Sequence, residues 1–149
     1  MKHLLAAAFL STLATVALAQ VEVSSAWARP AVPGQTGTGA FMTLMSKDGA
    51  RLIGAASPVA GVVEIHEMAM DNNVMKMRAI PSLELPAGRE VQLKPGGHHV
   101  MLLDLKQPLK VGDKVQVELR LETRDGKRVT RPVEVEVRAA APGHDPHKH

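Results

Sequence analysis

From residue 21 to residue 138, short segments of alternating apolar and polar side chains recur at intervals of roughly ten residues, with turn residues between them. Alternation with a period of two is typical of a β-strand, and no segment keeps a helical period for more than a turn or two. Clusters such as Lys47-Asp48-Gly49 and Lys94-Pro95-Gly96-Gly97 supply the turns. We therefore predict an all-β domain, an antiparallel Greek-key β-sandwich or small barrel.

The pattern predicts eight or nine strands. Their ranges are 21–28, 40–46, 51–57, 61–68, 74–80, 90–94, 98–105, 111–122 and 128–138. We expect an irregular connection between the fifth and sixth of these segments. Pro132 cannot donate a backbone hydrogen bond, so we expect it on an edge or at a bulge.

Residues 1–19 have the layout of a secretory signal peptide, with a basic start, an apolar run and a small-residue cleavage pattern ending at Ala19. The run is too short and too rich in small residues for a comfortable membrane span, and a retained anchor is the lesser alternative. We therefore expect a periplasmic protein with no stable membrane span. Its mature domain would cover residues 20–139, followed by a flexible tail at 140–149.

Composition excludes several classes of function. The formal net charge is only +3, with basic and acidic residues interspersed, which gives no case for nucleic-acid binding. Cysteine is absent, so a disulfide framework, a thiolate metal site and a blue-copper electron-transfer centre are excluded. No Gly-x-Ser-x-Gly turn, His-Glu-x-x-His helix or phosphate-binding glycine loop occurs. We expect a single-domain monomer that is not an enzyme.

Histidine and methionine are concentrated between residues 64 and 101. Three pairs there are spaced i, i+2, which places both members on one face of a strand: His66 with Met68, Met75 with Met77, and His99 with Met101. Imidazole nitrogen and thioether sulfur form a soft, uncharged ligand set. Among biological metals such a set favours Cu(I), because harder ions prefer oxygen and zinc sites are usually completed by other ligands.

The spacing alone leaves a second interpretation open. Methionine usually fills irregular gaps in a core, and we assign Met42 and Met45 to that role. A methionine-rich patch could also bind apolar peptides. On spacing alone, copper binding and ordinary packing therefore both stand.

The chain resembles the periplasmic copper chaperones called PCu(A)C, or PCuAC. The resemblance rests on the spacing His66-x10-Met77-x21-His99-x-Met101, and it extends over residues 21–138. Residues outside this spacing agree with the family: Ala26-Trp27, Gly39-Ala40-Phe41-Met42, Glu64-Ile65-His66-Glu67-Met68 and Pro95-Gly96-Gly97. His98 departs from the family pattern, and strand alternation points it away from His99.

The resemblance implies a cupredoxin-like fold and one Cu(I) ion bound by His66, Met77, His99 and Met101. Met68 shares the face of His66 and is a possible accessory ligand, although the family spacing does not include it. The family passes copper towards the CuA centre of cytochrome c oxidase subunit II, often alongside Sco-type copper proteins. A periplasmic copper buffer without a dedicated acceptor would use the same ligands and remains the alternative.

The tail carries three further histidines, His144, His147 and His149. Imidazole is a good donor for Cu(II), so these residues could form a second copper site. A terminus that only improves solubility is an equally good interpretation.

Overall fold

The computed structural model describes residues 20–143, which form ten β-strands and no helix. The strands are β1 (Val21–Ala28), β2 (Gly37–Ser46), β3 (Ala50–Ala56), β4 (Ala60–Asp71), β5 (Val74–Ile80), β6 (Leu83–Leu85), β7 (Glu90–Leu93), β8 (His99–Leu105), β9 (Lys114–Thr123) and β10 (Arg128–Val137). The predicted all-β, cupredoxin-like fold is confirmed, and each of the predicted strand ranges corresponds to one of these strands.

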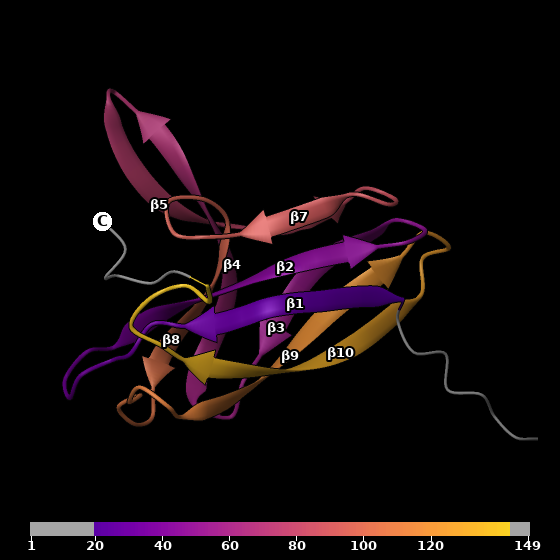
Figure 1. The fold of residues 1–149 in the computed structure, drawn as a ribbon. Helices are drawn as coiled ribbons and strands as arrows, with labels where there is room; N and C mark the ends of the chain where they lie inside the picture. The colour runs from indigo at the N-terminus through magenta and orange to yellow at the C-terminus, as the bar shows by residue number, and fades with distance from the viewer. Residues whose placement is uncertain (1–19, 144–149) are drawn as a thin grey trace, which may run out of the picture.

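The strands form one open sheet in the order β5-β4-β8-β2-β1-β10-β9-β3-β6, with β7 also paired to β2 (Figure 1). The sheet curls on itself, so that β3 and β4 are in contact although several strands separate them along the hydrogen-bonded path. One pair departs from the predicted antiparallel arrangement: β1 and β10 run parallel where Trp27 and Ala28 lie opposite Glu136 and Val137. Sequence alternation alone does not distinguish parallel from antiparallel neighbours.

Strand β2 organises the end of the sheet that carries the histidines. One of its edges pairs with β1, while the other pairs with β8 through Gly37–Ala40 and with β7 through Met42–Met45. Nearly all of β2 is therefore buried, including Met42 and Leu44. The core assignment of Met42 is confirmed.

The core lies between the two halves of the curled sheet and is almost entirely aliphatic. Every second residue is buried from Val115 to Leu121 on β9 and from Val133 to Val137 on β10, as alternation predicts for strands with one solvent-exposed face. Leu119 and Leu121 of β9 pack there with Val133 and Val135 of β10. Pro132 lies opposite Glu118 of β9, on a part of β10 that has no partner on its other side among the paired residues of β1. Its predicted edge position is confirmed.

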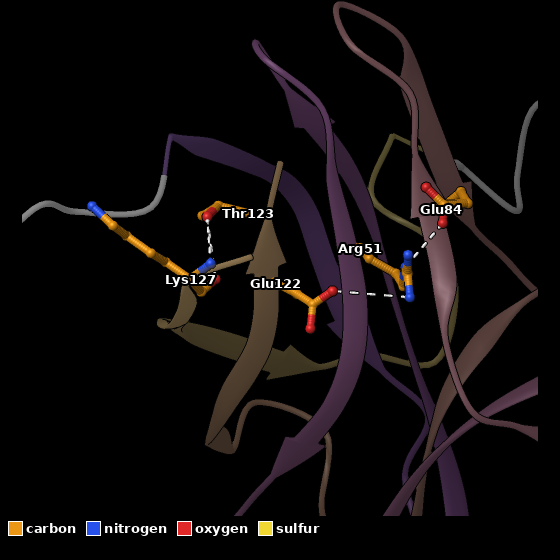
Figure 2. Close-up of polar contacts among 5 residues, drawn as sticks. All are labelled: Arg51, Glu84, Glu122, Thr123 and Lys127. Carbon is orange, nitrogen blue, oxygen red and sulfur yellow. Dashed lines mark hydrogen bonds and ion pairs between the residues drawn. The ribbon is translucent and has the colours of Figure 1, made fainter. Parts of the chain in front are cut away.

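The adjacent strands β9, β3 and β6 are also linked by charged side chains (Figure 2). Arg51 of β3 forms ion pairs with Glu84 of β6 at 3.0 Å and with Glu122 of β9 at 3.9 Å. The β9–β10 turn is held by Thr123, whose hydroxyl accepts a hydrogen bond from the backbone N–H of Lys127. The short strand β6 falls within the connection that we expected to be irregular. Three residues are too few to show a period, so its pairing with β3 could not be read from the pattern.

The hairpin formed by β4 and β5 extends beyond the rest of the sheet (Figure 1). Asn72 and Asn73 form its two-residue turn with φ angles of 48° and 64°, the left-handed geometry that matches the twist of a hairpin. Asparagine tolerates this geometry better than most residues. Almost every residue of β5 is exposed, so this strand contributes little to the core.

Two predictions concern parts of the chain outside the described residues. These are the signal peptide at 1–19 and the tail histidines His144, His147 and His149. Within residues 20–143, the structure contains no helix long and apolar enough to cross a membrane.

Candidate functional site

The register of three strands brings the predicted ligands to the base of the β4–β5 hairpin. His66 on β4 lies directly opposite His99 on β8, and Met68 on β4 lies opposite Met77 on β5. Residues directly opposite each other in antiparallel strands share a face of the sheet. Residues from three strands that are distant along the chain therefore lie side by side on one face of the sheet.

His99 presents one ring nitrogen to a sulfur atom. Its Nδ1 donates a hydrogen bond to the carbonyl oxygen of Gly97 at 2.9 Å, which requires the proton of the neutral ring to be on Nδ1. The other nitrogen, Nε2, then carries a lone pair and lies 3.0 Å from Sδ of Met77. Two electron-pair donors thus face each other, an arrangement that a soft cation between or beside them would stabilise.

In His66 the roles of the two ring nitrogens are exchanged relative to His99. Its ring centroid lies 5.6 Å from that of His99, and the residue is only 8% exposed. Nε2 donates to a carboxylate oxygen of Glu64 at 2.7 Å, whereas Nδ1 is buried and has no hydrogen-bond partner. A buried acceptor without a partner is costly in a folded protein. Since a bound metal ion would satisfy Nδ1, the residues present fit a metal site.

Met101 reaches the same region from β8. It lies opposite Glu64 of β4 and opposite Gly39 of β2. A Cβ atom on Gly37 would come within 3.1 Å of the Met101 methyl group, so glycine at this position leaves room for the end of the side chain. Met101 lines a hollow of about 400 Å³ together with Arg29, Phe41, Met68, Met77 and His99.

The surroundings of His99 favour the neutral form of its imidazole. Burial lowers its pKa from the ordinary 6.5, and charge repulsion from Arg29, and from His66 and His98 when they are protonated, lowers the pKa further. The hydrogen bond to Gly97 acts in the opposite direction but does not reverse the shift. A neutral imidazole is the form that binds a metal ion. Arg29 also packs against Phe41, with its guanidinium carbon 5.6 Å from the ring centroid.

The structure distinguishes the two adjacent histidines. His98 does not face the site: its Nε2 lies 3.8 Å from Glu67 on the opposite face of β4, as strand alternation predicts. Met68 shares the face of His66 and lines the hollow, which is compatible with an accessory role. The tail histidines lie outside the described residues.

Sequence reasoning missed Glu64. The predicted ligand set needed no carboxylate, yet Glu64 orients the ring of His66 by accepting a hydrogen bond from its Nε2–H. The signal was present, because Glu64 and His66 are spaced i, i+2 on a predicted strand. Among the described residues no three His, Asp or Glu side chains gather in a way that could hold a metal ion.

Comparison with known proteins gives two kinds of relative. Residues 21–137 match the family described as "Putative lipoprotein LpqE-like". The "Putative lipoprotein Lxx21020" of Leifsonia xyli is 37% identical over 119 residues, which cover 79% of this chain and 69% of that protein.

Solved structures show the same fold. The solution structure of CuI-DR1885 from Deinococcus radiodurans superposes with a TM-score of 0.56 at 31% identity, covering 87% of this chain and 83% of that one. The copper-bound PCuAC domain from PmoF2 gives a TM-score of 0.61 at 24% identity, covering 82% and 97%. Two structures of this fold are thus described as containing copper.

Proposed function

The chain belongs to the LpqE-like family and has the PCuAC fold, and from that premise we propose that it is a copper chaperone that binds one Cu(I) ion. The ligands would be Nδ1 of His66, Nε2 of His99 and the sulfur atoms of Met77 and Met101. The observation that carries this proposal is the orientation of free donors. Nε2 of His99 lies 3.0 Å from the Met77 sulfur, and Nδ1 of the adjacent His66 is buried without a partner.

The ligand chemistry supports Cu(I) in particular. Two imidazoles and two thioethers are neutral and soft, and Cu(I) prefers such donors over oxygen. The relative CuI-DR1885, whose name states Cu(I), shares 31% of aligned residues with this chain. Thioether ligands also suit an oxidising compartment, because a methionine cannot be captured in a disulfide.

A carrier must release its ion, and the site is placed for this. Met77 is 48% exposed on the projecting hairpin, so a partner can approach one ligand while the buried histidines still hold the ion. Four neutral ligands leave the ion with its single positive charge, and the weak thioether bonds favour exchange. We propose delivery to the CuA centre of cytochrome c oxidase subunit II, with a Sco-type protein as a further partner, and no enzymatic activity.

The proposed location is the periplasm. Residues 1–19 have the pattern of a signal peptide, and the family match is to lipoproteins, which supports export. For the tail we propose Cu(II) binding through His144, His147 and His149. Deletion of residues 141–149 tests this: loss of one Cu(II) equivalent supports the proposal, and unchanged Cu(II) uptake contradicts it.

The central experiment is an anaerobic Cu(I) titration against a colorimetric Cu(I) chelator. Wild type should withdraw one tightly bound equivalent, and Met77→Leu and His99→Ala should each weaken this binding strongly. Met45→Leu is the matched control, because it removes a thioether from β2 outside the hollow and should leave the binding unchanged. Tight Cu(I) binding that survives both site substitutions would overturn the assignment of ligands.

Delivery and storage use the same ligands and need a separate measurement. Copper-loaded protein mixed with an apo CuA domain should transfer its ion, and the rate should depend on whether a Sco-type protein is present. Retention of Cu(I) under all of these conditions would favour the copper buffer.

A further inference from the structure

The β4–β5 hairpin has two chemically different faces. On one face, Arg78 forms an ion pair with Glu67 at 2.6 Å. Lys76 and Asp71 form another at 3.0 Å near the turn. Between His66 and the turn, these pairs account for all the charged residues of both arms and leave this part of the hairpin close to electrically balanced.

The other face carries only thioethers beyond His66. Met68 lies opposite Met77, and one step further towards the turn Met70 lies opposite Met75. The register has no shift between these pairs, so all four side chains share the face of His66. The thioethers form a continuous row from His99, which contacts Met77, to the tip of the hairpin.

Core packing does not explain the two outer methionines. Met70 is 64% exposed and Met75 is 49% exposed, whereas Met42 in the core is 1% exposed. Neither belongs to the core cluster or to the partly buried residues packed against it. The hydrophobic effect therefore gives little reason for two long apolar side chains at this position, and their sulfur atoms are the feature that remains.

We propose that Met70 and Met75 form an outer Cu(I) site at the tip of the hairpin, distinct from the site at its base. This inference rests on the proposed function, since it assumes that the protein handles Cu(I). Directly opposite residues in an antiparallel pair have Cβ atoms about 4.5–5.5 Å apart, and methionine has three rotatable side-chain bonds. The two sulfur atoms can therefore converge on one ion.

The outer site is weaker than the inner one by its chemistry. It offers two exposed thioethers and no imidazole, so it holds Cu(I) only when the inner site is full or while an ion is in transit. Met68 and Met77 lie between the two sites on the same face, so an ion can pass from sulfur to sulfur without meeting a charged side chain. The tip is thus the point where an incoming or outgoing ion is first or last held.

The test is an anaerobic Cu(I) titration of the full chain, followed by NMR of methionine methyl groups labelled with ¹³C. The first equivalent should shift the methyl signals of Met77 and Met101. A second equivalent should shift those of Met70 and Met75. In the double variant Met70→Leu/Met75→Leu, which keeps the apolar volume, the second equivalent should bind more weakly in chelator competition, while the first equivalent should still shift the signals of Met77 and Met101.

Met45→Leu is again the matched control and should leave both sets of shifts intact. A second equivalent that moves no signal of Met70 or Met75 overturns the outer site and leaves these residues as an apolar contact surface. Because the readout is specific to each methyl group, copper bound by the tail histidines does not imitate the expected result. Failure of the first equivalent to shift Met77 and Met101 would instead overturn the proposed function, so the two failures are distinguishable.

Discussion

The two halves of the curled sheet form a sandwich around the core. This sandwich and the β4–β5 hairpin end use the same strand geometry with opposite results. In the sandwich, alternation buries aliphatic side chains such as Leu119 and Val135 completely and turns charged residues outwards. At the hairpin end, alternation places imidazole nitrogens and thioether sulfurs on one face of the strands, outside the aliphatic core. There Met77 is half exposed, and His66 has a buried nitrogen without a partner. The sandwich therefore supplies most of the stability of the fold. The hairpin end is less stabilising, because some of its nitrogen and sulfur atoms that could bind a metal have no partner within the protein.

The largest effect on stability is expected from a cavity created in the core of the sandwich, away from the site. This substitution tests whether stability and copper binding depend on separate regions. Leu119→Ala should lower the free energy of unfolding by about 2–5 kcal/mol, because Leu119 is fully buried in the core cluster. Urea unfolding measures the loss. Leu119→Met, which conserves volume, should cost less than about 1.5 kcal/mol. Folded Leu119→Ala protein should still bind one Cu(I), and loss of that binding would show that the two regions are not separable.

The next largest effect is expected at the site itself. His99→Ala removes a proposed ligand, so the Cu(I) affinity should fall by more than the roughly 10–100-fold that follows loss of a residue supporting a ligand. Chelator competition measures the affinity. His98→Ala is the matched control, since the side chain of His98 faces Glu67 and not the site. Equal losses in the two variants would contradict the assignment of His99.

Glu64 is not a proposed ligand, but its hydrogen bond orients the proposed ligand His66, and its substitution tests this supporting role. Glu64→Ala removes the acceptor of the His66 Nε2 proton, so the ring can turn or change tautomer, and Cu(I) affinity should fall by roughly 10–100-fold. Glu64→Gln keeps an oxygen acceptor and should recover part of the affinity. Glu67→Ala, on the opposite face of the same strand, should have little effect. A Glu64→Ala variant with wild-type affinity would show that the hydrogen bond does not position His66.

Features that depend on residues near one another in the chain could be predicted from the sequence, whereas features that depend on contacts between distant strands could not. Alternation and turn residues predicted the strands, because each signal is local, and the boundaries of 21–28 and 74–80 match β1 and β5. The ligand spacing indicated the donor residues before any geometry was known. The parallel pairing of β1 with β10 and the approach of His99 to Met77 depend on contacts across the sheet. Nothing local to those residues specifies such contacts, so they required the structure.

The smallest expected effect concerns protons at the base of the hairpin. Burial lowers the pKa of His99 in the folded protein, whereas the unfolded chain has the ordinary value of 6.5. As the pH falls below about 6.5, the imidazole of His99 binds a proton in the unfolded chain but remains neutral in the folded protein. The copper-free protein therefore loses stability. This contribution is complete above pH 6.5 and is lost progressively as the pH falls to the folded pKa.

Urea unfolding of wild type and His99→Gln at pH 8, 6.5 and 5 measures the effect. Wild type should lose more stability than the variant between pH 6.5 and 5, and the two should behave alike between pH 8 and 6.5. Identical pH dependence would mean that His99 is as accessible to protons as in the unfolded chain, and therefore that its burial does not hold the imidazole neutral. Because a metal ligand must be neutral, such a result would weaken the argument that this end of the fold keeps its donors ready for a metal ion.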